Sequence, residues 1–170
     1  MSILIFQNTV NSQIPSNLHP NSRVWIYQAD RAFSPKENIE IKELLDHFVD
    51  QWTTHGDKVK GFASVFFDRF IVFMADETDF MVSGCSKDSS VRLVKSIEEK
   101  YKISLFDRQL LLFLKNEELM QIALAEVSSS IQNNLINEHS HFFDNTVLTK
   151  QEFESNWIKQ LKNSWLKIKI

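Results

Sequence analysis

The fold is decided by the stretch RFIVFMAD, residues 69–76, taken together with RVWIYQAD, residues 23–30. Both segments run from an arginine through mostly apolar residues to an Ala-Asp pair. Short runs of β-branched and aromatic residues favour strands, and near-continuous apolar character is typical of strands buried on both faces. We therefore expect two buried strands that lie side by side and parallel at the centre of one sheet.

Each of these strands is followed by a predicted helix and then by a further strand. A capping box at Ser34 and Glu37 starts the first helix. The second helix follows the segment SGCSKDSS, residues 83–90. The remaining strands are GFASVFF, residues 61–67, and QLLLFL, residues 109–114. This order predicts an α+β fold with a ferredoxin-like, split βαββαβ core, built as a weak twofold repeat.

The remainder of the chain is arranged around this core. Residues 1–22 contain no charged side chain and are interpreted as an N-terminal arm of coil with a possible edge strand. Residues 23–170 are expected to form a single α+β domain. Within it, residues 23–115 are the βαββαβ core and residues 116–170 are a helical extension.

The extension is predicted to hold two helices, which start at Asn116 and at Thr149. The last helix, residues 149–166, carries Phe153, Trp157, Leu161 and Trp165 at four-residue steps. An apolar stripe of this kind must be buried. It packs either on the domain itself, in a homo-oligomer interface or in a groove of a partner protein, and these alternatives stay open.

The composition of the chain indicates which classes of partner and which cellular compartment to expect. The chain has 170 residues, 43% of them hydrophobic, and a net charge of -3, which gives no general attraction to nucleic acid or to anionic membranes. One cysteine excludes an internal disulfide framework and favours a reducing compartment. The first residues make a poor signal peptide, and no apolar run approaches the length of a membrane span. We expect a soluble cytoplasmic protein with neither nucleic acid nor membrane as a partner.

Several enzyme classes are excluded by missing motifs. Three glycines cannot build a dinucleotide-binding fingerprint, and no Gly-Lys-Ser/Thr sequence is present to form a phosphate-binding loop. Gly-x-Ser-x-Gly, Cys-x-x-Cys and His-Glu-x-x-His are absent as well. The chain is therefore not a conventional nucleotide hydrolase, dehydrogenase, serine hydrolase or zinc protease.

A set of motifs resembles an uncharacterised bacterial family of small proteins, whose members often carry the name ABC transporter ATPase. The motifs are WIYQADRAF, WTTHG, SGCSKDSSVR and FDR, and the resemblance covers roughly residues 23–127. It implies no established activity. The ATPase name is not carried over to this chain, because such an enzyme needs the phosphate-binding glycines and lysine that are missing here.

The parallel arrangement predicts a ligand site where the two central strands end. Asp30 and Asp76 would lie about 5 Å apart, each followed by a charged residue, Arg31 or Glu77. Carboxyl ends of parallel strands are frequent ligand sites, and guanidinium groups bind carboxylate or phosphate oxygens. The alternative is that arginines simply neutralise these carboxylates.

The segment 83–90 would leave from the same edge and add donors to that site. Backbone N–H groups at the start of a helix bind anions. The residues assigned to ligand binding in this segment are Ser83, Gly84, Ser86, Lys87, Asp88 and Ser89. The alternative is that Ser86 or Asp88 only caps the helix.

Catalytic candidates are Cys85, whose thiol lies near a helix start, and His55, which could act as its base. The alternative is a buried, unreactive thiol. His139, His141 and Asp144 are close in sequence, but no fourth ligand accompanies them, so no metal is assigned. No cofactor is assigned either. The preferred hypothesis is binding of an anionic or phosphorylated small molecule, and its rival is a non-enzymatic interaction module.

Overall fold

A computed structural model of the protein describes residues 3–79 and 81–169, and the chain is α+β as predicted. It divides into two compact units, which are described separately below. The larger unit comprises residues 14–107 and 148–151. The smaller unit comprises residues 3–13, 108–147 and 152–169. This division differs from the expected one, which had one domain from residue 23 onward.

The larger unit contains a three-stranded antiparallel sheet. Its strands, in spatial order, are β1 (Arg23–Gln28), β5 (Phe70–Asp76) and β4 (Lys60–Phe66). All seven residues of β5 are buried. The predicted strands are thus present, but the prediction that the two repeated segments run parallel is wrong. A central antiparallel strand is covered on both faces too, so its apolar pattern does not reveal its direction.

The turn between β4 and β5 explains the direction of these two strands. Phe67 and Asp68 both have φ near +50°, which makes a tight hairpin and places the two strands side by side. β1 then occupies the other edge of β5, with Arg23 opposite Ala75.

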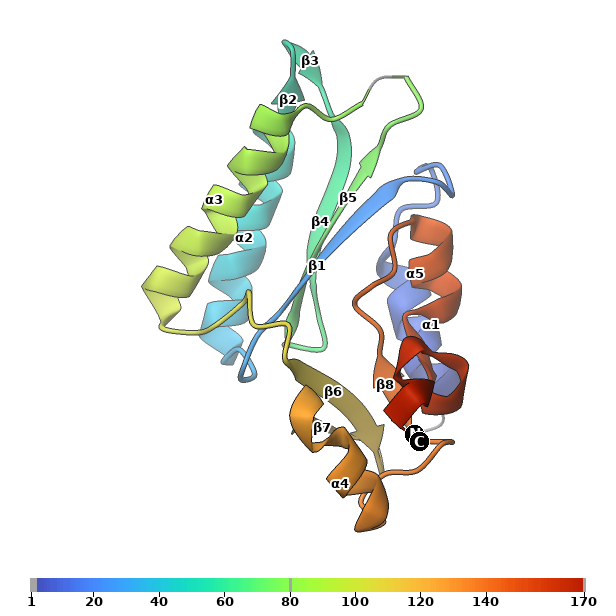
Figure 1. The fold of residues 1–170 in the computed structure, drawn as a ribbon. Helices are drawn as coiled ribbons and strands as arrows, with labels where there is room; N and C mark the ends of the chain where they lie inside the picture. The colour runs from blue at the N-terminus through green and yellow to red at the C-terminus, as the bar shows by residue number, and fades with distance from the viewer. Residues whose placement is uncertain (1–2, 80, 170) are drawn as a thin grey trace. The chain divides into compact units, whose positions relative to one another are not determined.

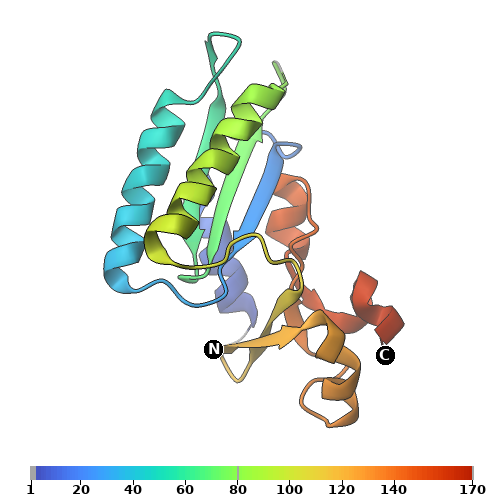
Figure 2. The same cartoon turned by 60° about the vertical axis from the view of Figure 1, so that its left-hand side comes forward.

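Two helices cover one face of this sheet (Figures 1 and 2). They are α2 (Pro35–Gln51) and α3 (Gly84–Tyr101). The predicted capping box of α2 is confirmed, since Ser34 accepts a hydrogen bond from the Glu37 N–H and Glu37 accepts one from the Ser34 N–H. α3 ends where Lys102 adopts a left-handed conformation. Four fully buried side chains anchor the two helices on the sheet, namely Ile41, Leu45, Val94 and Ile97.

α2 and α3 run antiparallel. The Trp52 indole, just after α2, hydrogen-bonds near the start of α3, whereas Glu40 near the start of α2 contacts Lys100 at the end of α3. Between α2 and β4 lies a short hairpin made of β2 (Thr53–Thr54) and β3 (Asp57–Lys58).

The smaller unit is built around a four-stranded antiparallel sheet in the order β7-β6-β8-β9. The strands are β6 (Leu110–Lys115), β7 (Glu118–Ala123), β8 (His141–Phe143) and β9 (Ile158–Gln160). The helices are α1 (Ile3–Gln13), η1 (Leu124–Glu126), α4 (Val127–Gln132), η2 (Leu161–Asn163) and η3 (Trp165–Lys169). A further helix, α5 (Lys150–Asn156), begins in the larger unit and continues into this one.

The ferredoxin-like prediction is therefore wrong. Its fourth strand, β6, pairs with β7 and β8 in a separate sheet and not with the strands of the larger unit. The N-terminal segment, expected to be coil with an edge strand, forms α1 over the described residues 3–13.

The predicted helix after Asn116 is also wrong at its start. Asn116 and Glu117 both have positive φ, which makes a two-residue hairpin turn between β6 and β7. The segment after the turn pairs with β6, and the helix begins only at Val127.

The last predicted helix, residues 149–166, is not continuous, because α5 ends at Asn156 and the chain then enters β9. Most of its apolar stripe is buried inside the protein, with Phe153, Trp157 and Leu161 at 0% exposure. Trp157 stacks on Phe153 with ring centroids 4.3 Å apart. The continuous helix that was proposed as an oligomer interface is thus not formed, and α5 makes up only its first part. Within residues 3–79 and 81–169, no helix combines the length and the apolar character needed to cross a membrane.

Candidate functional site

The predicted strand-end site is divided between opposite ends of the sheet. Arg23 at the start of β1 lies opposite Ala75 near the end of β5. Asp30 therefore follows the sheet at one end, whereas Asp76 lies at the other. The prediction that these two carboxylates lie side by side is wrong, because it depended on parallel strands.

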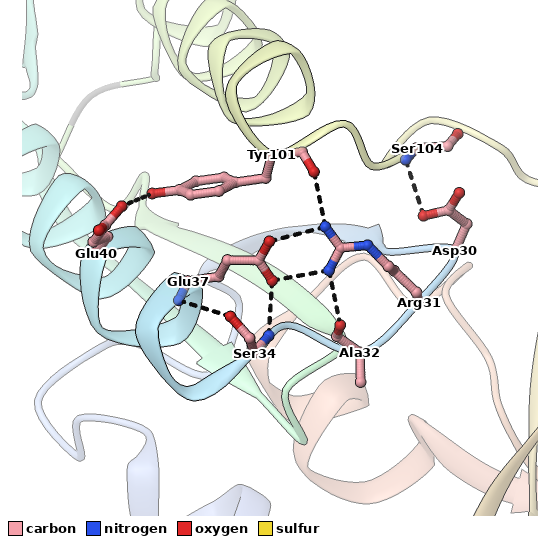
Figure 3. A network of polar contacts seen from close by, with 8 residues as sticks. All are labelled: Asp30, Arg31, Ala32, Ser34, Glu37, Glu40, Tyr101 and Ser104. Atoms are coloured by element: carbon pink, nitrogen blue, oxygen red, sulfur yellow. Dashed lines mark hydrogen bonds and ion pairs between the residues drawn. The ribbon is translucent and has the colours of Figure 1, made fainter.

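At the first end, Arg31 is held within the fold (Figure 3). Its Nη1 and Nη2 donate to the two carboxylate oxygens of Glu37 at 2.8 and 2.9 Å. Nη2 also donates to the Tyr101 carbonyl at 2.8 Å. The neighbouring Asp30 carboxylate accepts a hydrogen bond from the Ser104 N–H at 3.0 Å. The network joins the start of α2 to the end of α3.

The ion pair between Arg31 and Glu37 shifts the pKa values of both side chains. The hydrogen bond from Arg31, followed by that from the Ser34 N–H, lowers the pKa of Glu37 to about 2. The same contact with Glu37 raises the pKa of Arg31. Arg31 thus has a structural partner at its bidentate face, which is the face that would bind a ligand.

At the other end, Asp76 is equally engaged. Its carboxylate accepts hydrogen bonds from Lys60 Nζ at 2.9 Å, from the backbone N–H groups of His19 and Thr78 at 3.2 and 3.1 Å, and from the Thr78 hydroxyl. Burial alone would raise the pKa of Asp76, but these hydrogen bonds outweigh burial and hold the pKa well below its usual range.

Glu77 connects this corner to the start of α3. Its carboxylate accepts a hydrogen bond from the Val82 N–H at 2.9 Å and lies 3.9 Å from Arg23 Nη1. Glu77 therefore holds the end of the segment that leads into Ser83.

The segment SGCSKDSS is the cap and first turns of α3. Ser83 is the N-cap, and its hydroxyl accepts a hydrogen bond from the Ser86 N–H at 3.2 Å. The alternative that Ser86 or Asp88 caps the helix is thus wrong. No acidic residue occupies the first turn. In the described part of the chain, the N–H groups of Gly84 and Cys85 have no hydrogen-bond partner.

Side chains fix this helix start against the end of α2. The Ser86 hydroxyl donates to the Thr53 carbonyl at 2.6 Å, and the Trp52 indole N–H donates to the Ser86 carbonyl at 3.1 Å. Trp52 and Ser86 are both buried. The arrangement of α2 and α3 at this corner is therefore fixed by one buried and one partly buried hydrogen bond.

An open pocket of 940 Å³ lies at this corner, entirely within the larger unit. α2 contributes a stripe of residues with spacing of three and four, and α3 contributes its first turns. The lining residues are Leu44, His47, Phe48, Gln51, Trp52, Thr53, His55, Ser83, Gly84, Cys85, Ser86, Ser89 and Leu93. Among these described lining residues, none is Asp, Glu, Lys or Arg.

His55 reaches the pocket from the β2–β3 hairpin. It has φ of +51° and is followed by Gly56 with φ of +91°, and Thr54 pairs with Asp57 on either side. Positive φ at both central residues defines the turn type that matches the twist of a hairpin. The Gly in the His-Gly pair is therefore a conformational requirement of the turn.

The structure brings together one part of the predicted site. Ser83, Gly84, Cys85, Ser86, Ser89 and His55 all line the pocket, whereas Lys87 and Asp88 are not among its lining residues. The alternative of a buried thiol is wrong, because Cys85 is exposed. His55 and Cys85 share the pocket because α2 ends where α3 begins.

Two pocket residues, His47 and Gln51, were not predicted from the sequence. Both lie on the α2 face that also carries Leu44 and Phe48. Only the antiparallel packing of α3 beside α2 makes part of this face a pocket wall.

The residues considered as metal ligands in the sequence were His139, His141 and Asp144. Asp144 is 3.0 Å from Lys159 Nζ, and burial lowers the pKa of His141. Across the described residues, no group of three or more His, Cys, Asp or Glu is arranged to hold a metal ion.

Comparisons with known protein families, with curated proteins and with solved structures found no match.

Proposed function

We propose that the larger unit binds a small molecule in the pocket between α2 and α3, with an anionic group at the start of α3 and an apolar body against α2. The observation that carries this proposal is the composition of the pocket wall. Two histidines and unpaired backbone N–H groups lie in a wall that contains no charged carboxylate. Asp30 and Arg31 have no part in it.

Electrostatics favour an anion over a cation. The N-terminus of a helix carries a partial positive charge, and its first N–H groups need acceptors. Here the N–H groups of Gly84 and Cys85 are available, and no acidic side chain in the first turn neutralises them. Carboxylate or phosphate oxygens supply the acceptors that such a helix start binds. The imidazoles of His47 and His55 add further N–H donors nearby.

The apolar side of the pocket suggests what else the ligand carries. Leu44, Phe48 and Leu93 are half-buried side chains on its wall, and Trp52 lies buried beside them. Ligand pockets typically measure about 300–1,000 Å³ and are mostly apolar with a few polar groups. The pocket is large enough for an aromatic or acyl body attached to the anionic group.

A thermal-shift screen tests this proposal. The panel contains aromatic and aliphatic carboxylates, acyl phosphates, sugar phosphates and nucleotides. A ligand present at ~100 times its dissociation constant stabilises the folded state by ~2.7 kcal/mol. That corresponds to a rise in Tm of roughly 5–10 °C for a chain of this length. A panel that leaves Tm unchanged would count against the proposal.

A matched pair of variants locates the binding site. Ser89 lines the pocket and Ser96 is exposed further along α3, so Ser89→Asp and Ser96→Asp make the same change inside and outside the site. Ser89→Asp should abolish the thermal shift given by an anionic hit, because it brings a negative charge into the pocket. Ser96→Asp should leave the shift intact. Equal responses of the two variants would contradict the proposed location.

A second candidate function is thiol chemistry at Cys85. The observation in its favour is that the exposed thiol shares the pocket with His47 and His55. A neighbouring imidazole can accept the thiol proton and raise the nucleophilicity of sulfur. Iodoacetamide measures this directly, since the S–C bond forms as iodide leaves and the proton passes to the base.

The test compares alkylation of Cys85 in the wild-type chain and in His55→Asn. Asn tolerates the left-handed conformation at this position, so the hairpin is kept while the imidazole is lost. We expect alkylation several-fold faster than in the unfolded chain, and slower in His55→Asn. A rate equal to that of the unfolded chain would remove the thiol candidate.

A further inference from the structure

The wall of the pocket between α2 and α3 contains two imidazoles and no permanent cation. His47 lies on α2 and His55 lies in the β2–β3 hairpin, and both line the pocket. Among the described lining residues, none is Lys or Arg. Any positive side-chain charge in this wall must therefore come from a protonated imidazole.

Both imidazoles are available to a ligand. Each of the two side chains is exposed, and in the described part of the chain neither takes part in a hydrogen bond or an ion pair. Histidines outside the pocket differ in this respect. His139 Nε2 lies 3.1 Å from the Glu138 carboxylate, and His19 Nδ1 accepts a hydrogen bond from the Asn21 N–H at 3.1 Å.

The charged groups around the two imidazoles keep a constant charge near neutral pH. They are Glu43, Asp46 and Asp50 on α2, Asp57 and Lys58 in the hairpin, and Lys87, Asp88 and Arg92 on α3. Carboxylate, ammonium and guanidinium groups do not titrate between about pH 5.5 and 7.5, and thiols such as that of Cys85 ordinarily titrate above this range. Imidazole gains its proton within the range. The charge that varies with pH in this pocket therefore lies on His47 and His55.

We propose that anion binding in this pocket is coupled to proton uptake by His47 and His55, so that the affinity for a carboxylate rises as the pH falls below about 7. This inference rests on the proposed function, because it requires an anion in the pocket. Near pH 7.5, where imidazole is ordinarily neutral, the backbone N–H groups of Gly84 and Cys85 hold the anion. Near pH 5.5, imidazolium groups add a Coulombic attraction.

The sign and the size of the effect follow from linkage. A bound anion favours the protonated form of a nearby imidazole. Because coupling between two binding events is reciprocal, the protonated pocket binds the anion more tightly by the same factor. An opposite charge within ~4–6 Å shifts a pKa by about one unit or more. One unit corresponds to about a tenfold change in affinity.

Benzoate is a suitable probe for this coupling. It remains a monoanion throughout the range, and its ring suits the apolar wall formed by Leu44, Phe48 and Leu93. Dissociation constants are obtained from ¹H–¹⁵N spectra as benzoate is added near pH 7.5 and near pH 5.5, at constant ionic strength. We expect the dissociation constant to be about tenfold lower at the lower pH. Equal dissociation constants would overturn the proton coupling and leave the anion site in place. An absence of binding at both pH values would overturn the anion site and the coupling together.

Histidine variants test which groups take up the proton. His47→Gln and His55→Asn each remove one imidazole, and Asn tolerates the left-handed backbone at position 55. Each variant should reduce the pH dependence of benzoate binding, and the double variant should bind equally at both pH values. His139→Gln removes an exposed imidazole outside the pocket and should keep the full dependence.

Thermal unfolding at both pH values shows whether each variant is folded. A folded double variant that retains the wild-type pH dependence would overturn the assignment to His47 and His55. A loss of the dependence in His139→Gln would overturn it as well, because the proton would then be taken up outside the pocket.

Discussion

Gly61 in β4 has no room for a side chain. A Cβ built at this position would lie 2.7 Å from Cε3 and 2.9 Å from Cζ3 of Trp52. The backbone of Gly61 is not in the left-handed region, so alanine adds no backbone strain there. The main destabilising effect expected of Gly61→Ala is therefore the clash of the new Cβ with the Trp52 indole.

Trp52 cannot move away easily. Its N–H is bonded to the Ser86 carbonyl, and the Phe48 and Trp25 rings pack against it at centroid distances of 5.1 and 6.2 Å. Overpacking of this kind costs about 1–3 kcal/mol. For a chain of this length, we expect Gly61→Ala to lower Tm by roughly 2–12 °C.

Gly84→Ala is the matched control, and scanning calorimetry is the assay. A Cβ at Gly84 meets no atom within 4 Å, and the residue lies in the first turn of α3. Its replacement should be neutral or stabilise the fold by up to about 1 kcal/mol. If Gly61→Ala proved as stable as Gly84→Ala, the packing described around Trp52 would be refuted.

Three further outcomes are expected. The pKa of Glu37 is lower in the fold than its ordinary value of 4.5, so its ion pair stabilises the protein above that pH, and this contribution is lost as pH falls from 4.5 towards about 2. The difference in unfolding free energy between the wild-type chain and Glu37→Gln should therefore shrink over that range in urea titrations. Trp157→Ala should cost about 3–5 kcal/mol in urea unfolding because the ring is fully buried, and Trp165→Ala, at a side chain that is 45% exposed, should cost clearly less. Arg31→Ala should cost about 1 kcal/mol, since the ion pair is partly exposed, and should leave the affinity for an anionic hit unchanged in calorimetric titration because Arg31 lies far from the pocket along the sheet.

Local signals predicted much of the larger unit. The capping box at Ser34 forms its hydrogen bonds within four consecutive residues, and the helix that it starts is present as expected. The strands β1, β4 and β5 followed from short apolar runs with β-branched and aromatic residues. Patterns of this kind depend only on neighbours in sequence, so they predict a helix or strand independently of how the rest of the chain folds.

These local patterns did not predict the direction of the strands or which strands pair with each other. The similarity between residues 23–30 and 69–76 does not reflect a shared environment, because all seven residues of β5 are buried, whereas β1 is an edge strand in which only Val24 and Gln28 are buried. The positive φ values at Phe67 and Asp68 set the antiparallel direction of β4 and β5, and they close that hairpin without the glycine that usually marks such a turn. The same holds for Asn116 and Glu117, where an expected helix start is a hairpin turn.

In the candidate site too, features that depend on local sequence were predicted, and features that depend on packing were not. Cys85, His55 and the start of α3 were predicted from the sequence, because these residue types and the helix start are visible locally. They were also grouped with Asp30 and Arg31, because the two strands were expected to run parallel. His47 was missed because its position on the pocket wall depends on how α3 packs beside α2.

Chemical shifts of backbone amides show directly whether an anion binds at the start of α3. A ¹H–¹⁵N spectrum is recorded while the strongest anionic hit of the thermal screen is added, and inorganic phosphate serves as a second probe. We expect the amides of Gly84 and Cys85 to shift most, while those of Ala32 and Ser34 stay in place. Shifts centred on Ala32 and Ser34, or spread evenly over the chain, would contradict an anion site at the start of α3.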